Sequence, residues 1–126
     1  MPRVKVDIVP GGFLALAADR IGDRWRLWRT LAAVVGYARN DPNRGDYVMA
    51  AVRAWIVRER LDLSPEDVFT TSATCEELAT AAGWHVETVK DHMRQLVTLG
   101  VLDVVRQPGK NRATVYALEY PGLSDE

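Results

Sequence analysis

The side chains best suited to nucleophilic or metal chemistry are the single cysteine, Cys75, and the two histidines, His85 and His92. A cysteine in the first turn of a helix can have a lowered thiol pKa, because the helix dipole favours the thiolate. No spacing pairs either histidine with Cys75, and the three residues follow no zinc-binding pattern. The chain also lacks a glycine-rich phosphate loop. The sequence therefore predicts an inert Cys75, no catalytic site, no metal and no cofactor.

A second group of side chains offers positive charge and hydrogen-bond donors. Lys90 and Arg94 lie one turn apart in a segment with helical periodicity, and Lys110, Asn111 and Arg112 are consecutive in a polar segment. Side chains of these types bind phosphate oxygens and the edges of bases. Whether they act together depends on the elements that position them.

The first of these elements is a short helix that begins after Thr74. Thr74 and Glu77 form a capping box, in which each side chain satisfies a free backbone N–H of the first turn. The small apolar stripe that follows allows a second helix to cross closely. Its members are Leu78, Ala81 and Ala82. Gly83 is expected to end the helix in a left-handed conformation.

A second helix is predicted from about Val86 to Leu99, after a short turn at Trp84 and His85. Its apolar residues recur at helical spacing and should face the core. They are Val86, Val89, Met93, Leu96 and Val97. The residues between them should face outward: Thr88, Lys90, Asp91, Arg94 and Gln95. Trp84 is expected to fill the corner between the helices as a core aromatic.

A β-hairpin is predicted after Gly100. Residues 101–105 are apolar and mostly β-branched, and residues 113–118 alternate with period two. Residues 107–112 between them combine turn formers with donors. The sequence therefore predicts two strands joined by a long, polar, basic tip.

Length and composition favour one small domain with an N-terminal extension. The chain has 126 residues, 48% of them hydrophobic, which is enough for a globular core. The single cysteine excludes an internal disulfide and fits a reducing compartment. No apolar run approaches the length of a membrane-spanning helix, and the first residues do not resemble a signal peptide. We therefore expect a cytoplasmic protein that does not enter a membrane.

The net charge of −1 hides an uneven distribution. Residues 1–62 hold 11 Lys and Arg against 7 Asp and Glu, whereas residues 63–126 hold 5 against 10. Within the acidic half, residues 104–118 contain Arg106, Lys110 and Arg112 and no acid. A phosphate-binding surface needs only local positive charge, which this segment supplies and the N-terminal arginines could extend.

The N-terminal half is predicted from weaker patterns. They indicate a strand near residues 4–8, a short helix at 13–21 and a helix from an Asp23 cap to about Arg39. A loop at 40–45 and a helix from Asp46 to about Leu61 follow. A helical turn at 64–67 and a short strand at 69–71 complete this half.

One face of the helix that follows Asp23 is strongly apolar. It carries Trp25, Trp28, Leu31, Ala32 and Val35. This face either enlarges the core or contacts a partner, because Trp is favoured at interaction hot spots. We expect a homodimer in which Trp25, Trp28, Leu31 and Val35 pack against a second copy.

Residues 74–118, about a third of the chain, resemble the winged helix-turn-helix superfamily. The resemblance is carried by Glu77-Leu78-Ala79, Ala82-Gly83, Thr88-Val89, Leu96 and Leu99-Gly100-Val101-Leu102. It implies a mainly α fold with a small β-hairpin wing and an N-terminal helical extension. It also implies that the helix that starts at Asp46 is the first of three core helices. The expected division is an extension at 1–45, a winged domain at 46–120 and a frayed tail at 121–126. Transcription regulators and initiators of plasmid or phage replication share these residues, so no individual family is singled out.

The resemblance implies sequence-specific binding to double-stranded DNA, with the second helix in the major groove. Thr88, Lys90 and Arg94 would contact phosphates and base edges. His85, Glu87 and Asp91 would contribute to specificity, since carboxylates can accept a hydrogen bond from cytosine N4. The wing would hold the neighbouring backbone or minor groove through Arg106, Lys110, Asn111 and Arg112.

A protein-docking module is the alternative from another class. Some winged domains serve as docking parts, and the acidic Glu87 and Asp91 suit that use. A continuous positive strip that joins Arg94, Arg106 and the wing tip would favour DNA. An exposed apolar patch over the second helix would favour docking.

Overall fold

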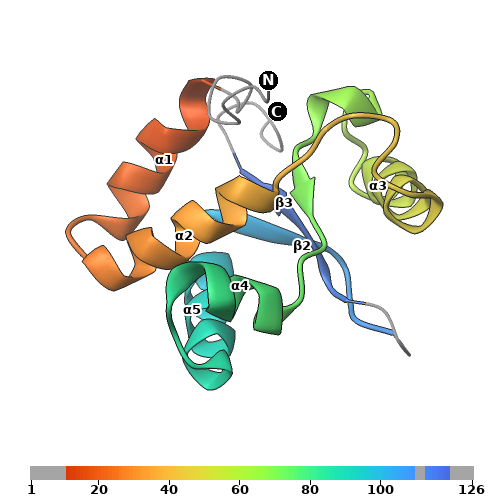
Figure 1. The fold of residues 1–126 in the computed structure, drawn as a ribbon. Helices are drawn as coiled ribbons and strands as arrows, with labels where there is room; N and C mark the ends of the chain where they lie inside the picture. The colour runs from red at the N-terminus through yellow and green to blue at the C-terminus, as the bar shows by residue number, and fades with distance from the viewer. Residues whose placement is uncertain (1–10, 110–112, 120–126) are drawn as a thin grey trace, which may run out of the picture.

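The structure, a computed structural model, describes residues 11–109 and 113–119. In this part the chain is mainly helical, with a three-stranded antiparallel sheet of order β1-β3-β2 (Figure 1). The elements are α1 (Gly11–Ile21), α2 (Trp25–Tyr37), α3 (Asp46–Arg58), the 3-10 helix η2 (Pro65–Asp67), β1 (Thr70–Thr71), α4 (Cys75–Ala82), α5 (Val86–Thr98), β2 (Leu102–Arg106) and β3 (Val115–Leu118). The strand expected near residues 4–8 and the tail at 121–126 lie outside the described residues.

The sheet is covered by helices on both faces, because both faces of its strands are apolar. Leu102 of β2 lies opposite Leu118 of β3, and both belong to a core shared with α1, α2, α4 and α5. Val115 and Ala117 of β3 point to the other face, where they pack with residues of α3. In Figure 1 the strands accordingly lie between α3 on the right and the other helices on the left.

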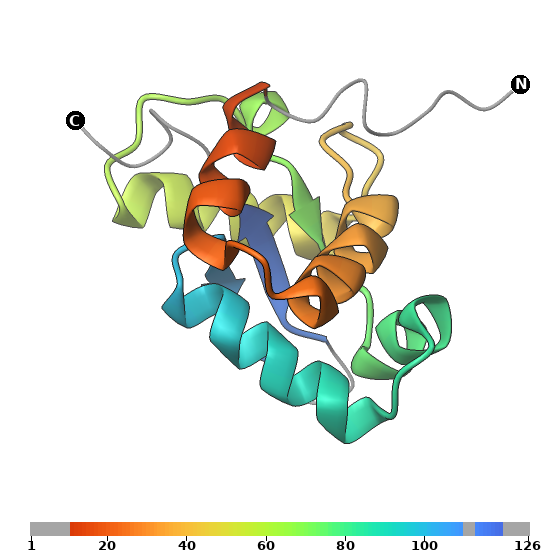
Figure 2. The same cartoon turned by 90° about the vertical axis from the view of Figure 1, so that its left-hand side faces the viewer.

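The first layer is built on α2, α4 and α5, which pack against one another, while α2 and α5 also contact the sheet. Figure 2 shows α5 running beneath α1 and α2, with α4 beside its start. The α1 helix adds three fully buried side chains to this core: Phe13, Ala17 and Ile21. The end of α5 is tied to α1 through Arg20, whose Nη1 donates to the carbonyl oxygen of the C-cap residue Leu99 at 2.8 Å.

The second layer is α3 alone, and its position corrects a prediction. The helix that starts at Asp46 was expected to be the first of three core helices, yet it packs against β2 and η2 through Val52 and Trp55. The prediction is wrong because α2 takes that place. Both helices carry an apolar stripe, and such a stripe does not specify which face of a sheet it covers. The expected boundary at residue 45 does not separate two cores, since one core joins Phe13 to Leu118.

The chain reaches α3 by crossing the edge of the sheet, where Arg44 fixes it. Arg39 and Thr70 exchange two backbone hydrogen bonds, with N···O distances of 2.9 and 2.8 Å. The Arg44 side chain, only 8% exposed, then donates to four oxygen acceptors. They are the carbonyl oxygens of Val68 (2.6 Å), Arg39 (2.9 Å) and Pro65, and Oγ1 of Thr70 (2.9 Å). Burial lowers the pKa of Arg44, and the carbonyl dipoles replace the water that the guanidinium has lost.

The expected helix ends are confirmed in α4 and differ in α2. Thr74 Oγ1 accepts from Glu77 N at 3.1 Å, and Thr74 N donates to Glu77 Oε1 at 2.8 Å, so the capping box forms. Gly83 ends α4 with a φ of +76°. Asp23 was expected to cap α2, but the helix begins one residue later, with Arg24 at the N-cap position and no side-chain cap.

Candidate nucleic-acid interface

Helix α5 has one buried and one solvent-exposed face. Leu96 is fully buried, whereas the Arg94 side chain is 73% exposed, so the predicted phase of the helix is confirmed. The other expected outward residues are exposed or half-buried: Thr88, Lys90, Asp91 and Gln95. His85 is the exposed N-cap residue, although its side chain makes no capping hydrogen bond. Glu87 follows in the first turn and is also exposed.

The charges on the outer face of α5 are paired with one another. Lys90 Nζ lies 3.3 Å from Glu87 Oε2, and Arg94 Nη2 lies 3.5 Å from Asp91 Oδ1. Gln95 Nε2 also donates to Asp91 Oδ2 at 2.8 Å. Each cation of this face therefore has a carboxylate one turn earlier, and the two pairs together carry no net charge.

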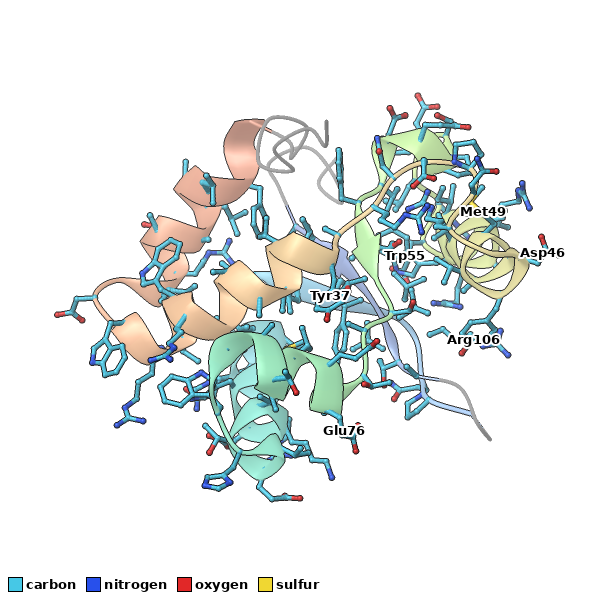
Figure 3. The ribbon with its side chains drawn as sticks, viewed as in Figure 1. Tyr37, Asp46, Met49, Trp55, Glu76 and Arg106 are labelled. Carbon is cyan, nitrogen blue, oxygen red and sulfur yellow. The ribbon has the colours of Figure 1, made fainter. Side chains whose placement is uncertain are left out.

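Arg106 lies on the side of the sheet that α3 covers. The register of β2 and β3 shifts between Val104 and Arg106, which marks a β-bulge at Val105. Such a bulge changes the face to which the next side chain points. The Arg106 guanidinium stacks 5.2 Å from the ring centre of Tyr47 in α3, and in Figure 3 it lies beside that helix. Lys110, Asn111 and Arg112 of the expected wing tip lie outside the described residues.

A groove of about 830 Å³ separates α5 from the β2–β3 hairpin. Its walls combine cations of α5 with apolar and aromatic side chains, among them Lys90, Arg94, Met93, Val97 and Tyr116. Cys75, at the start of α4, is half-buried on the same groove. Burial raises the pKa of its thiol, so the thiolate is disfavoured despite the helix dipole. Within the described residues, no cluster of His, Cys, Asp or Glu could hold a metal.

A second cationic region lies at the start of α2, and the sequence reasoning did not single it out as a site. Here Trp25, Arg26, Arg29 and Trp84 form what we call the arginine–tryptophan patch. The Arg26 guanidinium lies 5.2 Å from the ring centre of Trp25 and 5.3 Å from that of Trp84. The Arg29 guanidinium lies 4.8 Å from Trp84. The spacing of Arg26 and Arg29, three residues apart on a helix, was the available signal.

The α4–α5 turn leaves room for this patch. A Cβ atom at Gly83 would lie 2.7 Å from Arg29 Nη2, so any other residue there would displace the guanidinium from its place over the turn. The Trp84 ring packs edge-on against His92, with ring centres 5.7 Å apart. His92 itself is buried, and its Nδ1 lies 2.6 Å from Thr30 Oγ1 of α2. Burial lowers the pKa of His92. These contacts join α2 to α5 directly behind the patch.

The apolar face expected to form a homodimer is mostly buried within the chain. Leu31 is 1% exposed, while Trp28 and Val35 are half-buried against the same core. Trp28 Nε1 also donates to the Gly22 carbonyl oxygen at 2.9 Å. Trp25, at 59% exposure, and the small Ala32 remain exposed. The core of the chain therefore buries most of this face without a second copy, and the homodimer stays a prediction.

No protein-family model, curated protein or solved structure matches the chain. Within residues 11–109 and 113–119, no helix is long and apolar enough to cross a membrane.

Proposed function

We propose that the protein binds double-stranded DNA as a winged helix-turn-helix, with α5 as the recognition helix. The observation that carries the proposal is the two-sided character of α5. Val89, Met93 and Leu96 fix its inner face in the core, while the opposite face is polar and exposed along its length. A helix of this kind, after a tight glycine turn and before a β-hairpin, is suited to lie in the major groove.

The outer face of α5 would supply specificity more than affinity. Thr88, Lys90 and Arg94 are donors for phosphates and base edges, and His85, Glu87 and Asp91 occupy its N-terminal half. Because each cation is paired with a carboxylate, this face attracts phosphate weakly. Much of the electrostatic attraction must therefore come from the flanks of the helix, including Lys110 and Arg112 of the wing. The biological role would be control of transcription or initiation of plasmid or phage replication.

A second candidate is docking of a protein partner, and the groove beside α5 favours it. Met93, Val97 and Tyr116 give this groove an apolar lining, which a purely phosphate-binding surface does not need. In that case Lys90 and Arg94 would lie at the rim of a protein interface.

The test is selection of duplex fragments from a random pool, followed by titration of the selected duplex at several salt concentrations. Arg94→Ala should weaken binding and keep the melting temperature, because its side chain is exposed. Lys110→Ala with Arg112→Ala should lower the slope of log K against log salt by roughly two at most. Arg53→Ala, an exposed arginine of α3, is the matched control. Failure to bind any duplex at low salt would reject the proposal and favour docking.

A further inference from the structure

The arginine–tryptophan patch lies beside the start of α5. Trp84 is two residues before the first residue of that helix, and its ring contacts the guanidinium groups of Arg26 and Arg29. Arg24, the N-cap residue of α2, is also exposed and lies two residues before Arg26 in the sequence. Among the described residues, no carboxylate forms a salt bridge with Arg24, Arg26 or Arg29, in contrast to the cations of α5.

The indole rings hold the guanidinium of Arg26 in place without neutralising it. The rings of Trp25 and Trp84 are 6.0 Å apart, and the guanidinium lies near both of them. A guanidinium that stacks on aromatic rings keeps N–H groups available at its edge, and these match the oxygens of a phosphate. Because the side chain is already ordered, less conformational entropy is lost when it binds an anion.

The patch and the hairpin lie toward different parts of α5. The patch adjoins its first turn, whereas the hairpin groove is lined by Lys90, Arg94 and Val97 from its middle and end. A helix of 13 residues is about 20 Å long. A duplex that receives α5 in its major groove would therefore present phosphates both to the hairpin and to the start of α2.

We propose that Arg26 and Arg29, ordered by Trp25 and Trp84, form a phosphate clamp for the DNA strand that borders α5 at its N-terminal end. This inference rests on the proposed DNA-binding function. Positive charge without carboxylate partners favours the phosphate backbone over an apolar protein surface. The indole of Trp25, at 59% exposure, would lie against the same strand.

The test compares two double variants of equal charge in the salt titration of the selected duplex. Arg26→Gln with Arg29→Gln removes the two clamp cations, whereas Arg53→Gln with Arg60→Gln removes two exposed arginines at α3 and the turn after it. Each lost phosphate contact should lower the salt slope by about 0.9. The clamp variant should therefore lose up to about two units of slope, and the control variant should keep the wild-type slope.

The possible failures can be told apart. If the wild-type protein binds no duplex, both the proposed function and the clamp are rejected. If Arg94→Ala weakens binding but the clamp variant keeps the wild-type slope, only the clamp is rejected. Equal losses in the clamp and control variants also reject it, because they would reflect net charge alone.

Tryptophan fluorescence provides a readout that does not depend on affinity. Saturation with the duplex should quench the emission of the exposed Trp25 and shield it from acrylamide. Trp25→Phe keeps an aromatic ring beside Arg26 and should abolish most of this DNA-dependent change. If the full change persists in Trp25→Phe, the DNA strand does not pass over the patch and the clamp is rejected.

Discussion

The outer face of α5 and the start of α2 differ in how their cations are arranged. On α5, Lys90 and Arg94 each have a carboxylate one turn earlier, with N···O distances of 3.3 and 3.5 Å. At the start of α2, Arg26 and Arg29 stack on indole rings, and no described carboxylate forms a salt bridge with either. The first region is an exposed polar helix face whose charges cancel in pairs, and the second has cations without a described carboxylate partner. A DNA-binding surface would combine the two.

Arg44 shows a third environment for the same residue type. Its guanidinium is buried, and carbonyl oxygens from the sheet edge and η2 satisfy it. The chain has 13 Arg and 3 Lys. The count alone therefore does not show which arginines could bind DNA, because partners within the fold decide which are available.

If α5 binds DNA through its outer face, only its inner face should contribute much to the stability of the fold. Leu96→Ala should lower the free energy of unfolding by about 2–5 kcal/mol, because it leaves a cavity in the core. Arg94→Ala should change it by less than about 0.5 kcal/mol. Urea denaturation measures both values. A large destabilisation by Arg94→Ala would mean that the two faces of α5 are wrongly assigned.

Arg44 is expected to contribute to stability, unlike the surface arginines. Arg44→Met should lower the free energy of unfolding by roughly 1.5–3 kcal/mol, because buried acceptors such as the Val68 carbonyl oxygen lose a charged donor. Arg53→Met, on the exposed side of α3, is the control and should be nearly neutral in the same urea titration. A neutral Arg44→Met would show that water can replace the guanidinium at the sheet edge.

The sequence predicted best those features that depend on neighbouring residues. The capping box of Thr74 and Glu77, the left-handed Gly83 and the buried Leu96 are confirmed, because each follows from local backbone chemistry or helical periodicity. The short strand expected at 69–71 and the helical turn expected at 64–67 are also present as β1 and η2.

Features that depend on distant contacts were missed. The sequence did not show that α2 rather than α3 joins α4 and α5, since both helices are amphipathic. It did not reveal the bulge that directs Arg106 toward Tyr47, nor the partner that buries His92. The patch brings Trp84 to Arg26 and Arg29 from a segment more than 50 residues away. Helical spacing indicated that two arginines share a face, but not what that face contacts.

Removing one carboxylate from α5 should give its outer face a net positive charge, as at the start of α2. Asp91→Asn removes the carboxylate beside Arg94 and should strengthen binding to random duplex DNA by up to about fivefold, equivalent to about 1 kcal/mol. If Asp91 also accepts from a cytosine, preference for the selected duplex should fall at the same time. Asp62→Asn, an exposed acid outside α5, is the control in a competition titration. Weaker binding to random duplex would contradict the inhibitory role given to Asp91.

His92 of α5 joins the two compared regions through the 2.6 Å contact of its Nδ1 with Oγ1 of Thr30 in α2. Burial holds the pKa of His92 below its ordinary value of 6.5; the Asp91 charge opposes this shift and Arg26 reinforces it. Protonation is therefore easier in the unfolded chain than in the folded one. The contribution of this pKa difference to the free energy of unfolding is complete above pH 6.5. It is lost as the pH falls through the lower pKa of the folded state.

His92→Gln removes this titration, and its amide can still form a hydrogen bond with Thr30. The free energy of unfolding of the wild-type protein should consequently fall more between pH 7.5 and 5.5 than that of His92→Gln, as measured by urea denaturation at both pH values. Subtracting the two pH dependences removes the contribution of groups that titrate alike in both proteins. If the two proteins lose equal stability, the burial of His92 has no thermodynamic effect, and the contact between α2 and α5 should then hold the patch beside α5 equally well at both pH values.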